Sequence, residues 1–362
     1  MIPFINPDLT IVEARAAHDV ILGGFVNEGN LAKGFEEAIA AFVGSRYAVV
    51  TTSCTVALSL ALMALEIKKK QIIVPDITMI GTAMAVVMSD NVPVVVDVLD
   101  NGCIDPNQIG RFVTSNTAAI IPVHVNGRNA LTPELIHTAS KYNLEIIEDA
   151  ACCLGSKFDG KQVGTCGRVG CFSLAATKII GCGQGGIVVT NDFDLYQKIV
   201  RLKDWGRFEE KGMLHPFVGF NFKFTDIQAS IALVQLERLS QLVEKKKYIY
   251  NYYRERLKEL MFVSKENDGF CPWYVDIKGK KNYVQILKER GVGSQMIWPP
   301  LHRQGAMTNF LRRGQNFPIA SRLEEMILWL PSSTKLTESD MDLVCGQLGE
   351  IVDNNNIGTG SR

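Results

Sequence analysis

Short, mainly apolar runs alternate with longer Ala-rich or amphipathic runs between residues 47 and 200 of the chain. The short runs predict strands, and they lie at residues 47–51, 71–74, 92–98, 118–125 and 144–147. The runs between them predict helices, at residues 55–65, 81–88 and 133–142. Continuous apolar strands that alternate with helices are typical of a mostly parallel sheet with both faces covered, so the pattern predicts an α/β fold.

The pattern changes after residue 192. Thr225 and Gln228 have the spacing of a capping box, which predicts a long helix from residue 225 to about residue 260. The remainder mixes the two patterns, with a strand predicted at residues 270–277 and helices predicted at 283–290 and 338–352.

This change divides the chain into parts. We expect a large domain of residues 1–240 and a smaller C-terminal α/β domain of residues 241–352, joined by the long helix. Residues 353–362 are polar and rich in glycine, and we expect them to form a disordered tail.

Composition excludes several classes of protein. The chain has 362 residues, and its 38 basic residues balance 38 acidic ones, so no basic stripe points to a nucleic-acid partner. The first residues lack the cationic and apolar regions of a signal peptide, and no apolar run is long enough to cross a bilayer. We therefore expect a cytoplasmic protein that makes no membrane contact.

The nine cysteines are odd in number and follow no secretion signal, which argues against a disulfide framework. Several fall between residues 152 and 182, but that stretch holds no C-x-x-C pair and no histidine. The ligand spacing of a structural zinc site is absent, so the sequence predicts no metal site and small buried side chains instead.

Lys178 stands out chemically, because it lies between the apolar residues Phe172 and Leu174 and the glycine-rich stretch 181–186. Most lysines are solvated surface charges, whereas burial makes a lysine amine a better nucleophile. The acid pair Glu148 and Asp149 ends an apolar strand upstream, where open α/β sheets bind ligands. An amine that forms a Schiff base and an acid that pairs with a pyridinium nitrogen are the groups that pyridoxal phosphate (PLP) chemistry requires.

A phosphate also needs a binding place, and residues 51–55 provide hydroxyl groups between a strand and the start of a helix. The same residues could form a plain helix cap. Ser173 could add a phosphate contact. The stretch 181–186 formally contains G-x-G-x-x-G, but a strand pattern follows it rather than a helix, so we reject a dinucleotide fingerprint.

These segments, in this order, resemble the DegT/DnrJ/EryC1/StrS family of sugar aminotransferases over about residues 2–350. The resemblance is carried by S-C-T-V-A-L at 53–58, P-D-I-T at 75–78, H-V-N-G at 124–127, E-D-A-A at 148–151, F-S at 172–173 with Lys178 and G-Q-G-G at 183–186, and G-F-N-F-K-F-T-D-I-Q-A at 219–229.

The resemblance implies a PLP-dependent aminotransferase of fold type I, with a mostly parallel, seven-stranded-type sheet covered by helices and a smaller C-terminal α/β domain. It implies that Lys178 holds PLP and moves the proton, and that Asp149 pairs with the pyridinium nitrogen. The residues that it places on the phosphate are Cys54, Thr55, Ser173 and, from the neighbouring subunit, Asn221. The active site would then be shared across a homodimer.

Among the members of this family, the sequence motifs of the chain most resemble those of perosamine and viosamine synthases. They imply transfer of an amino group from L-glutamate, through pyridoxamine phosphate, to C4 of a nucleotide-linked 4-keto-6-deoxyhexose for amino-sugar and polysaccharide biosynthesis. His302, in P-P-L-H-R-Q at 299–304, and Lys223, in place of the usual arginine, are candidate substrate contacts.

Some positions depart from the family pattern. Met79 stands where an aromatic residue usually stacks on the PLP ring, and Cys152 stands where Gln, Glu or His usually bonds the 3′-oxygen. Three alternatives follow: amination at C3, a PLP-binding regulator without activity, and a dehydratase. Lys178 argues against the dehydratase, because those relatives replace this lysine by histidine.

Overall fold

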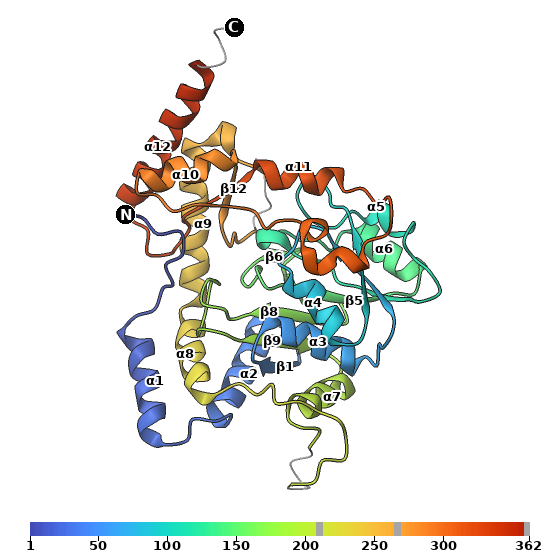
Figure 1. Ribbon diagram of the computed structural model, residues 1–362. Helices are drawn as coiled ribbons and strands as arrows, with labels where there is room; N and C mark the ends of the chain where they lie inside the picture. Colours follow the sequence, from blue (N-terminus) through green and yellow to red (C-terminus); the bar gives the residue numbers. More distant parts are fainter. Residues whose placement is uncertain (208–212, 264–268, 358–362) are drawn as a thin grey trace.

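The computed structural model describes residues 1–207, 213–263 and 269–357, and a seven-stranded sheet forms its centre (Figure 1). The strand order is β1-β9-β8-β5-β4-β2-β3. The strands are β1 (Tyr47–Thr51), β2 (Gln71–Pro75), β3 (Val92–Val96), β4 (Thr117–Ile120), β5 (Glu145–Asp149), β8 (Val169–Ser173) and β9 (Gly186–Thr190). Strands β3, β2, β4, β5 and β8 run parallel, and β9 runs antiparallel to both of its neighbours.

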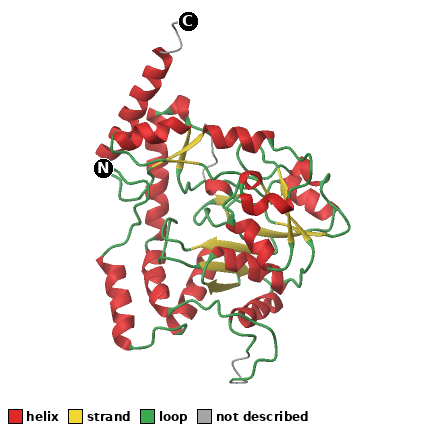
Figure 2. Ribbon diagram, in the orientation of Figure 1, coloured by secondary structure: helices red, strands yellow, loops and turns green. Residues whose placement is uncertain are grey.

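Helices cover both faces of this sheet, as the apolar strands predicted (Figure 2). One face packs on α3 (Cys54–Ala64), α4 (Gly81–Met88) and α7 (Phe193–Lys203). The other packs on α2 (Asn30–Val43) and α8 (Asp226–Glu237), and near β3 on α5 (Pro106–Ile109) and α6 (Pro133–Lys141). Neighbouring residues of β9 alternate between these two cores, because successive side chains of a strand point to opposite faces. The predicted α/β fold is confirmed.

The predicted long helix is two helices. Thr225 and Gln228 form the predicted capping box at the start of α8, but the helix breaks at Arg238 before α9 (Leu239–Arg256). The Arg238 guanidinium pairs with Asp8 and Glu13, so the break lies where the N-terminal segment crosses. Helix α1 (Ile11–Gly23) lies beside α8 (Figure 1).

A second, antiparallel sheet of three strands lies toward the C-terminus, in the order β10-β12-β11. Its strands are β10 (Val275–Lys278), β11 (Gln295–Met296) and β12 (Ile327–Leu330). Helices α9, α10 (Lys281–Glu289) and α12 (Glu338–Ile357) enclose its core, and α11 (Pro318–Met326) leads into β12. The smaller α/β part is therefore present, and the boundary at residue 240 stays a prediction.

Three predicted bounds are wrong. The strand predicted at 118–125 ends as β4 at Ile120, because Pro122 has no N–H and pairing resumes only as a bridge between Val123 and Asp149. The strand predicted at 270–277 begins only at Val275. The closing helix continues past the predicted end at residue 352 to Ile357, since elongation of a packed helix gains one hydrogen bond per residue. The rest of the predicted tail, residues 358–362, lies outside the described residues.

The described residues also bear on metal binding and on insertion into a membrane. Among the described residues, no cluster of three His, Cys, Asp or Glu side chains is placed to hold a metal ion. In the same part of the chain, every helix is too short or too polar to span a bilayer.

Candidate active site

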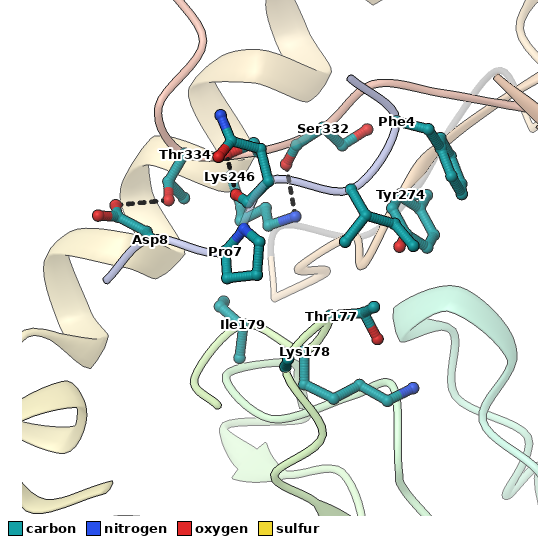
Figure 3. Close-up of a pocket in the computed structure, with 14 residues that line it drawn as sticks. Phe4, Pro7, Asp8, Thr177, Lys178, Ile179, Lys246, Tyr274, Ser332 and Thr334 are labelled. Carbon is teal, nitrogen blue, oxygen red and sulfur yellow. Dashed lines mark hydrogen bonds between the residues drawn. The ribbon is translucent and has the colours of Figure 1, made fainter. Parts of the chain in front are cut away.

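Lys178 lies in the loop between β8 and β9, which folds back on itself through backbone hydrogen bonds. Leu174 N–H donates to the Gly185 carbonyl at 2.9 Å, and Lys178 N–H donates to the Ala175 carbonyl at 2.9 Å. Lys178 lines a cavity at this loop, and its side chain runs along the edge of that cavity, with the amine directed away from Lys246 (Figure 3). Its Nζ donates to Cys152 Sγ at 3.1 Å and lies 3.5 Å from the centroid of the Trp273 ring. The amine is thus held between a sulfur atom and an aromatic face.

Asp149 is buried at the end of β5, and β5 runs parallel to β8, the strand that leads into the Lys178 loop. Its Oδ2 accepts a hydrogen bond from Thr82 Oγ1 at 2.7 Å, and its Oδ1 accepts one from the Ala151 N–H at 3.1 Å. Burial raises the pKa of Asp149, and the Thr82 hydrogen bond, the Ala151 N–H and the charge of Lys178 oppose that rise. The carboxylate is oriented, dry and within electrostatic reach of the lysine.

The neighbouring acid, Glu148, has a different environment. His124 Nδ1 accepts from the Ala130 N–H at 3.0 Å, so Nε2 carries the proton that it donates to Glu148 Oε2 at 2.9 Å. Glu148 also accepts from the N–H groups of Cys166 at 2.7 Å and Gly164 at 3.0 Å. Burial raises the pKa of Glu148, but these hydrogen bonds outweigh it and the pKa is lowered. Glu148 therefore fixes the backbone around β5 and has no acceptor left to spare for a ligand.

The predicted phosphate turn is the N-terminus of α3, where Ser53 Oγ accepts from the Val56 N–H at 3.2 Å. A Cβ on Gly186 would lie 2.6 Å from the Cys54 nitrogen, so a glycine is needed for β9 to approach the helix start this closely. Ser173 is the register partner of Gly186 across β8 and β9, which brings its hydroxyl to the same turn. Burial, then the charge of Asp149, raises the pKa of the Cys54 thiol, which keeps it neutral.

Met79 lies at the edge of this turn, and its side chain is 50% exposed. Its Sδ accepts from the Gly81 N–H at 3.0 Å. A Cβ on Gly81 would lie 2.5 Å from Thr55 Oγ1 and 2.9 Å from Met79 Cε, so Thr55 and Met79 are neighbours. The structure therefore brings together the sequence-predicted residues Cys54, Thr55, Met79, Asp149, Cys152, Ser173 and Lys178.

Asn221 and Lys223 lie elsewhere in the chain. Asn221 is exposed and bridges to Asp204, and Lys223 Nζ pairs with Asp204 Oδ1 at 2.8 Å. Neither residue is among those that line the cavities next to Lys178 in the described part of the chain. A role for Asn221 in a neighbouring subunit's site stays a prediction.

His302 is not among the described residues that line the cavities next to Lys178, and it supports Asp76. Its Nδ1 lies 2.5 Å from Asp76 Oδ2, its backbone N–H donates to Asp76 Oδ1 at 2.8 Å, and its ring stacks on Phe317. Burial raises the pKa of Asp76 to about 6, against these His302 contacts. His302 is thus engaged within the protein, and a substrate contact for it stays a prediction.

Sequence reasoning missed three residues of the site: Thr82, Trp273 and Lys246. Composition predicts a helix at Thr82 and nothing more, whereas the structure shows that Thr82 orients Asp149. The sequence pattern predicts a strand at Trp273, but its ring covers the lysine amine, and Lys246 lines the same cavity as Lys178. The Pro272-Trp273 pair carried a signal, because proline interrupts a strand and leaves the next residue free for another role.

Comparison with known proteins now decides the family. Residues 7–349 match the DegT/DnrJ/EryC1/StrS aminotransferase family. The chain is 31% identical over 361 residues to GDP-perosamine synthase from Escherichia coli O157:H7, covering 97% of this chain and 98% of the relative. The chain belongs to the DegT/DnrJ/EryC1/StrS aminotransferase family.

Solved structures of this family have the same fold. A DegT DnrJ EryC1 StrS aminotransferase from Brucella abortus superposes with a TM-score of 0.88 at 27% identity, covering 94% of this chain and 95% of that one. DesV from S. venezuelae, solved in complex with a ketimine intermediate, superposes with a TM-score of 0.90 at 26% identity, covering 96% and 98%. The resemblance found in the sequence is confirmed, and the chain is a sugar aminotransferase of PLP fold type I.

Proposed function

We propose that the chain transfers an amino group from L-glutamate to C4 of a nucleotide-linked 4-keto-6-deoxyhexose, for amino-sugar and glycan biosynthesis. The observation that carries the proposal is the placement of the Lys178 amine, 3.1 Å from Cys152 and within electrostatic reach of the buried Asp149. The match to GDP-perosamine synthase supports amination at C4 rather than C3.

The residues of the site fit PLP. The N-terminus of α3, with the Thr55 and Ser173 hydroxyls, offers donors to a phosphate. Asp149 would face a protonated ring nitrogen, since a buried carboxylate gains most from a cation. When bound, PLP supplies an electron sink for the carbon that loses a proton.

Three side chains of the protein would then have separate roles in the reaction. Thr82 holds the Asp149 carboxylate in one orientation, so that the charge faces the site. Lys178 Nζ would take the proton from one carbon and return it to the other. Cys152 stays a neutral thiol, because burial raises its pKa against the charge of Lys178, and it can therefore act only as a weak donor or acceptor.

We also propose a homodimer with shared sites, in which Asn221 reaches the partner's cofactor phosphate. Asn221 lies next to a segment whose apolar side chains are exposed on the single chain. They include Trp205, Met213, Leu214, Phe217 and Val218. A patch of this kind is typical of an interface. Pyridoxamine phosphate would be the intermediate form of the cofactor between the two substrates.

The test is to offer a panel of UDP-, dTDP- and GDP-linked 3-keto and 4-keto sugars with glutamate, and to identify products by mass and NMR. The proposal expects a 4-amino-6-deoxyhexose product from the wild type and none from Lys178→Ala. A 3-amino product would replace the C4 assignment. Binding of PLP without any product across the panel would favour a regulator instead.

A further inference from the structure

Trp273 and Tyr274 lie outside the strands, yet groups from three separate segments hold them. Trp273 Nε1 donates to the Thr177 carbonyl at 2.7 Å, and Lys246 Nζ donates to the Trp273 carbonyl at 2.7 Å. Asn126 pairs with both backbone groups of Tyr274 at 2.6 Å, accepting from its N–H and donating to its carbonyl. These contacts explain why the predicted strand begins only at Val275.

Holding Trp273 in this way is costly for the fold. Lys246 is 6% exposed, and its ammonium donates to two neutral carbonyls, those of Trp273 and, at 2.6 Å, of Ser332. Burial lowers the pKa of Lys246 to about 8, with the Cys271 thiol opposing the shift. Asn126 has a φ of 53°, in the left-handed region. A buried charge without a carboxylate partner and a residue in the left-handed region each destabilise the fold. Such residues are typical of functional sites, where the surrounding structure must hold side chains in fixed positions.

The ring that these contacts fix has little freedom to move. Trp298 and Trp329 pack against it at centroid distances of 5.7 Å and 5.5 Å. The Lys178 amine lies over the ring, 3.5 Å from its centroid. The negative face of an indole attracts a cation at this distance, and the attraction is larger in a site from which water is excluded.

We propose that the Trp273 ring is the resting position of the Lys178 amine whenever that amine is protonated and not bonded to a carbonyl carbon. The inference rests on the proposed function, in which Lys178 leaves the cofactor and carries one proton between two carbons. The ring holds that proton's charge next to the reacting carbon, and no proton is gained or lost over the transfer. Trp273 is then a catalytic residue, and Lys246 and Asn126 are positioning residues.

Two variants test the ring. Trp273→Leu removes the aromatic face, and Trp273→Phe keeps a smaller face but loses the bond to Thr177. The titratable groups that face the amine, Cys152, Asp149 and Cys54, are unchanged in both. Trp298→Phe is the matched control, since a phenyl ring keeps an aromatic face packed on Trp273, and Trp298 makes no contact with the lysine in the described part of the chain.

The first measurement is the pH midpoint for labelling of the free Lys178 amine by an amine-reactive reagent in protein without PLP, followed by peptide mass. Removing the ring disfavours the cation, so Trp273→Leu should lower this midpoint by about one pH unit, and Trp273→Phe by less. The second measurement is the rate of the glutamate half-reaction, which should fall about 5- to 30-fold in kcat for Trp273→Leu with little change in KM. Trp298→Phe should match the wild type in both.

Lys246→Met tests the positioning role. A residue that only stabilises the fold would lower Tm without moving the midpoint, whereas a positioning residue moves the midpoint in the same direction as Trp273→Leu. The inference is wrong if Trp273→Leu and Trp273→Phe load PLP on Lys178 and keep the wild-type midpoint and rate. If the wild type carries no PLP on Lys178, the proposed function fails first, and peptide mass after borohydride reduction separates the two results.

Discussion

Two lysines line the cavity drawn in Figure 3, and different kinds of groups hold their amines. Lys246 extends from α9, and its amine donates hydrogen bonds to the carbonyls of Trp273 and Ser332. Lys178 extends from the β8–β9 loop and faces a thiol and an aromatic ring, neither of which is a strong acceptor. Burial alone therefore does not make a lysine reactive. The amine must also be left without strong hydrogen bonds that a reaction would have to break.

The largest effect is expected from Lys178→Ala, which removes the amine that this comparison identifies as the reactive one. Proton transfer by a positioned side chain is worth about 10²- to 10⁴-fold, so transamination should fall by more than about 10³-fold. The loop keeps its backbone hydrogen bonds, and Tm should change little. Steady-state rates with glutamate and circular dichroism check both parts. Turnover by this variant at more than a few per cent of the wild-type rate would contradict the assignment.

The next largest effect is expected at the two adjacent acids, Asp149 and Glu148, which differ in whether their loss lowers activity or stability. Asp149→Asn removes the charge that would face the ring nitrogen, and should lower kcat by about 10²-fold while leaving the fold intact. Glu148→Gln should instead destabilise the protein by about 2–4 kcal/mol, because it removes a buried charge that accepts from His124 and several N–H groups. Denaturant unfolding and half-reaction rates, measured on both variants, separate the two roles. Equal losses of unfolding free energy in Asp149→Asn and Glu148→Gln would contradict the separate roles of the two acids.

Lys246 gives a prediction about pH. Its pKa is about 8 in the folded protein and about 10.5 in the unfolded chain, so the unfolded state binds more protons between these values. Stability therefore rises with pH across this window, by up to roughly 3 kcal/mol from this group. Lys246→Met should remove that rise. Urea unfolding at pH 7.5 and pH 10 for both proteins measures the difference, and identical pH slopes would contradict the account of this lysine.

The smallest effect is expected from Cys152→Ser. A hydroxyl can accept from the Lys178 amine as the thiol does, so the geometry at 3.1 Å should survive. We expect kcat to change by less than about threefold, which is within the energy of one neutral hydrogen bond. A loss of more than tenfold would mean that the sulfur has a chemical role of its own.

The sequence alone predicts the fold and the functional groups that lie at the ends of strands. The strand pattern located the end of β5, and with it Asp149, because the carboxyl ends of parallel strands mark ligand sites. It could not find Trp273 or Lys246, since Trp273 contacts the Lys178 loop, and Lys246 contacts Trp273, across segments that are far apart in the chain. Trp273 also had the local pattern of a strand. Lys246 holds the Trp273 carbonyl and Asn126 holds the backbone of the next residue, Tyr274, and no local pattern connects either residue to this segment.

The most direct test of the comparison between the two lysines is to load the protein with PLP, reduce it with borohydride, and locate the adduct by peptide mass. The account predicts an adduct on Lys178 and none on Lys246. An adduct on Lys246, or equal labelling of both lysines, would contradict it.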